Sequence, residues 1–129
     1  MVSERLVSVQ WLAVGGGAAI GAWIRWGLGI ALNASMLPMG TLVANLGGGL
    51  LMGMSMAYFA STCAQDPTRL LVMTGFLGGL TTFSAFSAEA FNFLQKQQYA
   101  WAVGHIASHV VGSLLMTAMG FALVHYLRS

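Results

Sequence analysis

The chain has 129 residues, of which 57% are hydrophobic and only 6% are charged. Soluble domains carry about 25% charged residues, so this composition indicates a membrane protein. The net charge of +2 rests on five basic and three acidic residues, too few for a basic nucleic-acid-binding surface. Because Cys63 is the single cysteine, an internal disulfide is excluded.

Four apolar segments are long enough to cross the hydrocarbon core of a lipid bilayer, which takes about 20 residues. They cover residues 6–32, 38–62, 69–94 and 99–127, and the links between them are short and polar or contain proline. The sequence therefore predicts an all-α membrane protein, with one four-helix transmembrane domain over residues 1–129 and both termini on one side.

The first segment carries a small-residue pair and one charge. Gly17 and Gly21 have the spacing that lets two membrane helices approach closely. Arg25 lies between Trp23 and Trp26, a pattern typical of a side chain that reaches the lipid–water interface. The alternative is a fixed positive charge at an aqueous vestibule, where it would attract anions.

The second segment opens at Pro38 and contains Thr41, Asn45 and a run of glycines. A carboxamide inside a membrane needs hydrogen-bond partners. Asn45 therefore either bonds to a neighbouring helix or binds a polar species that crosses the membrane. Its NH₂ group would make it a donor to an anion.

The third segment is interrupted by Gly75, Gly78 and Gly79, followed by Thr81 and Thr82. Closely spaced glycines weaken a helix, and threonine can cap a new one, so we expect a helix broken near mid-membrane. Backbone groups freed at such a break are tolerated only inside protein or beside a water or ion pathway. The break is thus a candidate site.

After the break, Phe83, Phe86 and Ser87 share one helix face, and Ser84 flanks them. This face either lines a pathway or packs against another membrane helix, and the local pattern favours neither.

Three further ionisable residues lie within the spans. Glu89 is a candidate proton carrier or gate; the alternative is that it reaches water at the nearby interface marked by Lys96 or pairs locally. His105 and His109 have the spacing of zinc ligands, but Ile106 stands where the HExxH motif needs glutamate and no third ligand follows nearby. We therefore expect the histidines to line a polar pathway or to bond to neighbouring helices.

The basic residues give only a weak orientation signal. Arg5, Arg69 and Arg128 fall on the side of the termini, whereas Lys96 and possible interface residue Arg25 fall on the other. Such a small difference predicts a chain that inserts in both orientations. Two opposed copies would then form an antiparallel homodimer around a twofold axis, with both breaks at mid-membrane.

These residues resemble the Fluc (CrcB) family of bacterial fluoride channels over nearly the whole chain. The matching motifs are Gly21-Ala22-x-x-Arg25, Gly40-Thr41-x-x-x-Asn45 and Gly75-Phe76-x-Gly78-Gly79-x-Thr81-Thr82-Phe83-Ser84-x-Phe86. The resemblance implies a passive, fluoride-selective channel in the bacterial plasma (inner) membrane that lowers cytoplasmic fluoride. It also implies a dual-topology dimer with two antiparallel pores.

The resemblance assigns roles residue by residue. A central Na⁺ ion would be held by the backbone carbonyls of Gly78 and Thr81, and Arg25 would lie at a vestibule. The implied fluoride pathway comprises Asn45, Phe83, Phe86, Ser84, Ser108 and Thr41. The fourth segment departs from the family pattern. Gly104 stands four residues before Ser108, where the resemblance leads us to expect tyrosine, and Gly112 stands at the next step of the track, four residues after Ser108. His105 or His109 would then continue the polar track.

Two other functions remain open at this stage. A small proton-coupled multidrug exporter is also a four-span, dual-topology dimer, but it needs a carboxylate in the first span, and Glu89 is the only membrane candidate here. A non-transporting helper subunit that only packs against partners is the other. Enzyme chemistry is not expected, because no nucleophile–base pair or phosphate-binding loop is present.

Overall fold

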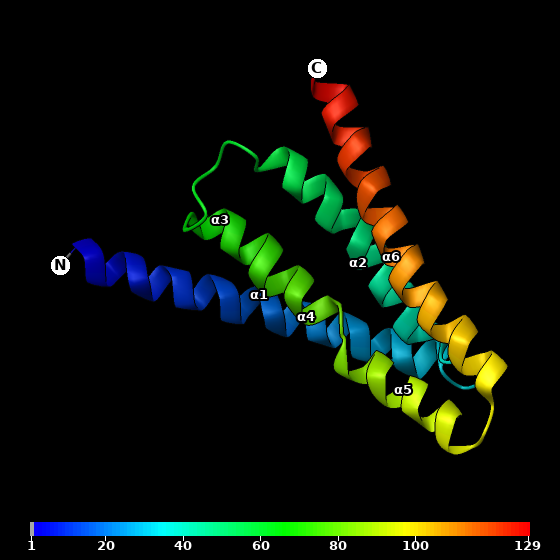
Figure 1. Ribbon diagram of the computed structural model, residues 1–129. Coiled ribbons are helices and arrows are strands. Elements are labelled where there is room, and N and C mark those ends of the chain that lie inside the picture. Colours follow the sequence, from blue (N-terminus) through cyan, green and yellow to red (C-terminus); the bar gives the residue numbers. More distant parts are fainter. Residues whose placement is uncertain (1) are drawn as a thin grey trace.

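The computed structural model describes residues 2–129 and is helical almost throughout (Figure 1). The long helices are α1 (Val2–Leu32), α2 (Met39–Tyr58) and α6 (Tyr99–Arg128). Between α2 and α6 the chain forms α3 (Pro67–Arg69), a π-helix η1 (Leu70–Leu77), α4 (Gly78–Leu80) and α5 (Ser84–Gln95). In the described part of the chain, four segments are long and apolar enough to cross a membrane. The predicted four-span, all-α architecture is confirmed.

Two predicted boundaries shift. The first helix begins at Val2 rather than near residue 6, and α2 ends at Tyr58 rather than near residue 62. Residues 59–62 form a turn in which Arg69 Nη1 donates to the carbonyl oxygen of Thr62 at 2.7 Å. This contact ties the turn after α2 to the start of the third segment.

The helices associate in two pairs. The segment η1–α4 lies along α1, and α2 lies along α6 (Figure 1). The pairs diverge toward the two chain termini and come together near α5, which packs on α6. Both termini therefore lie at one end of the molecule, as expected for four spans.

Backbone contact at glycines holds each pair together. A Cβ atom added at Gly21 would lie 2.1 Å from the Phe76 carbonyl oxygen, and one added at Gly53 would lie 1.9 Å from that of Thr117. Neither position has room for a side chain. The predicted close contact at Gly17 and Gly21 is confirmed, and its partner is the glycine-rich half of the third segment.

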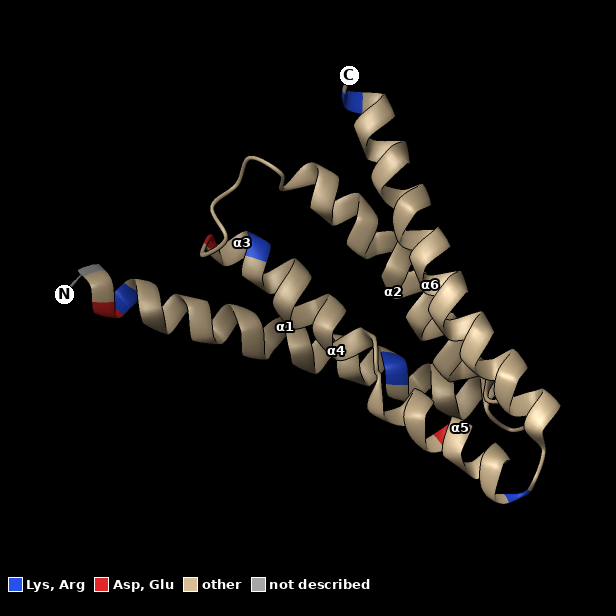
Figure 2. Ribbon diagram, in the orientation of Figure 1, with Lys and Arg blue, Asp and Glu red and all other residues tan. Residues whose placement is uncertain are grey.

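The apolar core is small. One buried cluster comprises Ala44, Leu77 and Leu80, while many large hydrophobic side chains on α1 and α6 are exposed. Lys, Arg, Asp and Glu are few and lie mostly near the ends of the helices (Figure 2). An apolar exterior with few charges suits a chain surrounded by lipid.

Candidate functional site: the helix break and its polar neighbours

The third segment breaks where the sequence predicts it. α4 ends at Leu80, Thr81 is extended with φ −87° and ψ 156°, and α5 begins at Ser84. The Thr82 hydroxyl oxygen accepts a hydrogen bond from the Ala85 N–H at 3.1 Å and so caps the new helix. The segment before the break, η1, is a π-helix rather than an α-helix, which the sequence did not predict.

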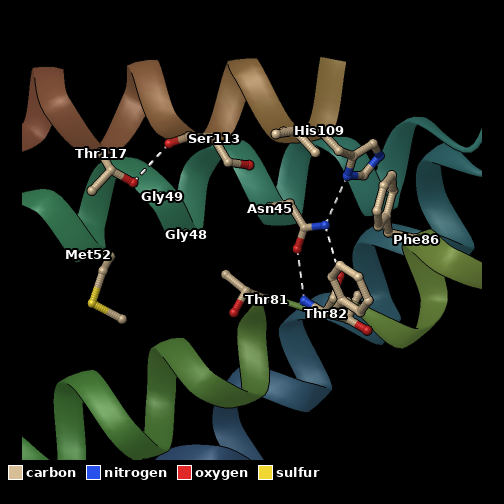
Figure 3. Close-up of a pocket in the computed structure, with 12 residues that line it drawn as sticks. Asn45, Gly48, Gly49, Met52, Thr81, Thr82, Phe86, His109, Ser113 and Thr117 are labelled. Carbon is tan, nitrogen blue, oxygen red and sulfur yellow. Dashed lines mark hydrogen bonds between the residues drawn. The ribbon is translucent and has the colours of Figure 1, made fainter. Parts of the chain in front are cut away.

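Asn45 of α2 satisfies the backbone of the break. Its Oδ1 accepts from the Thr82 N–H at 2.8 Å, and its Nδ2 donates to the Thr82 carbonyl oxygen at 3.0 Å (Figure 3). The same Nδ2 lies 3.0 Å from Nδ1 of His109. All hydrogen-bonding capacity of the amide NH₂ is thus used within the protein. Of the two uses predicted for Asn45, the structure shows the bond between helices.

Arg25 supports the break from the other side. Its Nε donates to the Gly79 carbonyl oxygen at 3.0 Å, whereas the neighbouring Trp23 and Trp26 are 68% and 69% exposed. The arginine therefore faces the protein and the tryptophans face outward. It also lines a hollow of about 380 Å³ with Thr41, Thr82 and Glu89, among others. This placement differs from a simple lipid anchor and fits a charge beside a polar cavity.

Phe83 and Phe86 have different environments. Phe86 is 8% exposed and its ring packs on those of His105 and His109, at centroid distances of 5.4 and 4.7 Å. Phe83 is 78% exposed and meets Phe86 edge-on at 5.6 Å. Ser84 is exposed as well, with its hydroxyl 3.3 Å from that of Thr82. Phe83 and Ser84 are therefore available to a neighbouring molecule.

A polar cluster of Thr41, Glu89 and His105 joins α2, α5 and α6. The Thr41 hydroxyl donates to Oε1 of Glu89 at 2.5 Å, and Nε2 of His105 lies 3.2 Å from Oε2 of Glu89. Thr41 is buried and Glu89 is half-buried. Of the two uses predicted for Glu89, the structure shows local pairing within the protein.

The polar row on α6 includes the histidines rather than Ser108. Ser108 is exposed, donates to the Gly104 carbonyl oxygen at 2.6 Å, and lines a different hollow from Asn45. His109, Ser113 and Thr117 instead line a hollow of about 330 Å³ beside Asn45 (Figure 3). The structure thus does not bring Ser108 to the break, and its place in a fluoride pathway stays a prediction.

The spacing of polar residues on α6 is the signal for this row. His105, His109, Ser113 and Thr117 recur every four residues, which places them on one helix face. The same spacing relates Thr41 to Asn45 on α2. Gly112, by contrast, packs against Leu46, where an added Cβ would lie 2.7 Å from the leucine side chain.

The predicted sodium ligands lie at the two ends of α4, because Gly78 begins this helix and Thr81 follows it. Gly78 is exposed and nothing lies within 4 Å of a Cβ added there, while Thr81 is half-buried and its hydroxyl donates to the Leu77 carbonyl oxygen at 2.8 Å. Both residues therefore lie at a surface of the single chain. The sodium site remains a prediction about the dimer.

The chain is similar in sequence to known proteins over most of its length. Residues 12–121 match the family model described as "CrcB-like protein, Camphor Resistance (CrcB)". The chain belongs to the CrcB-like family. Its relatives include proteins named "Fluoride-specific ion channel FluC" from Pseudomonas putida, Aromatoleum aromaticum and Nitrosospira multiformis, which are 53%, 56% and 52% identical to it. These alignments cover 90%, 86% and 89% of this chain and 94%, 87% and 92% of the relatives. The resemblance to CrcB-like proteins stated from the sequence is confirmed.

Proposed function

We propose that this chain is a passive fluoride-selective channel, which exports fluoride across the bacterial plasma (inner) membrane, and is not an enzyme. The observation that carries this proposal is the broken third helix, whose backbone is bonded to Asn45. The sequence supports it, because the chain is 53% identical, over 90% of its length, to a protein named as a fluoride-specific channel. The multidrug-exporter alternative gains no support, because the relatives described above carry the fluoride-channel name.

The physical problem for fluoride is the replacement of its hydration shell. Hydroxyl and amide donors and the positive edges of aromatic rings can do this without binding the ion too tightly to release it. Such groups line the hollows next to the break, among them Thr82, Phe83 and Phe86. The pathway therefore runs beside the break, with Asn45 positioning the Thr82 backbone and Arg25 attracting anions to the hollow next to it.

The functional unit is an antiparallel homodimer. Phe83, at 78% exposure, and Gly78 lie on the surface of one chain next to the break. Lipid cannot hydrogen-bond to backbone groups freed at the break, whereas a protein partner can cover them. A second copy of opposite orientation would cover them and would bring Gly78 and Thr81 carbonyls of both chains to one point. Hard oxygen ligands suit a small cation, so a structural Na⁺ ion is expected there.

The test is fluoride efflux from liposomes that contain the purified protein, measured with a fluoride electrode and compared with chloride efflux. Fluoride should leave down its electrochemical gradient without a proton gradient. Uphill fluoride movement driven by a pH gradient alone would show a coupled transporter. Liposomes that release no fluoride would instead favour a non-transporting subunit.

A further inference from the structure

Three buried polar atoms without hydrogen-bond partners converge between α5 and α6. They are Oε2 of Glu89, Nε2 of His105 and Nε2 of His109. One ligand atom from each of these residues lies within 4.8 Å of the other two. Glu89 Oε2 and His105 Nε2 lie 3.2 Å apart as an ion pair without hydrogen-bond geometry, and Nε2 of His109 has no hydrogen-bond partner. Because buried polar atoms are nearly always hydrogen-bonded in proteins, their convergence at one point indicates a missing ligand.

We propose that Glu89, His105 and His109 bind a divalent transition-metal ion such as Zn²⁺, and that the bound ion slows conduction. Two imidazoles and one carboxylate are a ligand set of zinc sites that keep a fourth position open. Tetrahedral ligands about 2.0–2.1 Å from zinc lie roughly 3.4 Å from one another. The 3.2 Å between His105 Nε2 and Glu89 Oε2 already matches this spacing. The sequence near His105 and His109 contains no third metal ligand, but the fold supplies one from another helix, Glu89 of α5.

The ligands are held in position without the ion. Thr41 donates to Oε1 of Glu89, which leaves Oε2 free and fixes the carboxylate. Phe86 packs on both imidazole rings, and Phe93 packs on that of His105 at 5.5 Å. Ligands oriented by such neighbours bind metal more tightly, because less freedom is lost on binding.

Metal binding is linked to the helix break through Asn45. Thr82 fixes the orientation of the Asn45 amide, so Nδ2 donates to Nδ1 of His109 and the neutral ring carries its proton on Nε2. A metal bound at Nε2 displaces that proton and favours the tautomer with Nδ1–H, which can no longer accept from Asn45. The ion would thus disturb the contact that holds the break.

The cluster can be reached from two surfaces. Glu89 lines the hollow that also contains Arg25, and His105 lines a hollow of about 220 Å³ beside Pro38 and Trp101. Because the guanidinium of Arg25 repels cations from the first, the second is the favoured route for a metal ion.

The first test measures Zn²⁺ binding to the purified protein by calorimetry, and Co²⁺ binding by its ligand-field absorption. The expected result is one ion per chain. His105→Gln and His109→Gln should each weaken binding at least about tenfold. His125→Gln is the matched control, since His125 lies on the same helix but is exposed and stacks on Phe121. Equal binding by the wild type and both cluster variants, or no saturable binding, would overturn the site. If the histidine variants do not fold, Glu89→Gln serves in the same titration.

The second test concerns conduction, and this part rests on the proposed fluoride channel function. Zn²⁺ should slow fluoride efflux through the wild type and His125→Gln, but not through His105→Gln, each compared with its own metal-free rate. Mg²⁺, which prefers oxygen ligands, should have no effect. Zinc binding without slower efflux would refute the inhibition. A protein that conducts no fluoride without metal would refute the channel function, while the titration would still decide the site.

Discussion

The two halves of the third membrane segment meet at residues 81–83 and are stabilised in different ways. The first half, η1 with α4, packs on α1 by backbone contact at glycines, and its Leu77 is fully buried. The second half, α5, packs on α6 through the ring of Phe86 and the carboxylate of Glu89. One half is apolar and fixed, and the other carries the polar chemistry.

Within one membrane segment, apolar glycine contacts and polar side-chain contacts are thus separated along the chain. Polar groups in a bilayer are costly unless they are paired, so they gather where α2, α5 and α6 can satisfy one another. The glycine contacts of the first half fix the height of the break against α1. The second half is then free to present Phe83 and Ser84 to a partner.

The largest expected effect comes from filling the glycine contact of the first half. A Cβ at Gly21 would lie 2.1 Å from the Phe76 carbonyl oxygen and 2.6 Å from the Leu80 nitrogen, so Gly21→Leu should separate α1 from the third segment. We expect no folded protein by size-exclusion chromatography. The control is Gly27→Leu on the same helix, where nothing lies within 4 Å of an added Cβ. Normal elution of Gly21→Leu would mean that the glycine contact is not needed.

The next effect follows from breaking the joint between the halves. Asn45→Leu removes the partners of the Thr82 N–H and carbonyl groups. An unsatisfied buried group costs about 1–3 kcal/mol, and these partly buried groups should cost less than that each. We expect a lower unfolding temperature and little fluoride flux. Asn92→Leu, which removes an exposed carboxamide from α5, should change neither. Wild-type stability in Asn45→Leu would show that the break is held by other contacts.

The sequence was sufficient to predict the spans, the break and the glycine contact, because each depends on residue types that are close in the chain. It did not predict the π-helix η1, since the apolar run over residues 70–77 has no pattern that distinguishes it from an α-helix.

The sequence also did not decide which polar residues of α6 face the break. Ser108 and His109 are adjacent, so they point about 100° apart on a helix. The family resemblance favoured Ser108, whereas packing of α6 on α2 turns His109 toward Asn45. The pairing of Glu89 with His105 joins two helices and has no local signal. Only the fold brings these residues together.

Removal of sodium should have the third largest effect. The proposed ion would bind in the proposed dimer, where the first half of the third segment ends. The proposed ligands are backbone carbonyls of Gly78 and Thr81, so Thr81→Ala should keep part of the site. Protein prepared in a large organic cation should show less fluoride flux and a lower unfolding temperature than protein in sodium. Equal flux and stability in both preparations would exclude a structural sodium ion.

Phe83 at the joint and Phe86 of the second half should matter less for stability than for flux. Isoleucine keeps much of the bulk of Phe83 or Phe86 but lacks the polarised ring edge. Ring interactions are worth about 0.5–1.5 kcal/mol, so flux should fall by up to roughly tenfold. Phe86→Ile should also lower the unfolding temperature slightly because Phe86 is buried, whereas Phe83→Ile should not. Unchanged flux in both variants would assign the rings to packing alone.

The smallest expected effect concerns Arg25, which contacts the first half but shares its hollow with Glu89 of the second. In its proposed role as a fixed charge, it would attract fluoride over a distance set by the Debye length, about 10 Å at 0.1 M salt and 30 Å at 0.01 M. Arg25→Gln should therefore reduce flux mainly at low ionic strength, while Arg25→Lys, which keeps the charge, should reduce it less. Loss of the bond to the Gly79 carbonyl oxygen would instead weaken the break at every salt concentration. The measurement that separates these two roles is the ratio of wild-type to Arg25→Gln flux across a series of salt concentrations. A ratio that falls toward one as salt is raised indicates that Arg25 attracts anions. A ratio that stays constant indicates that Arg25 acts by stabilising the fold.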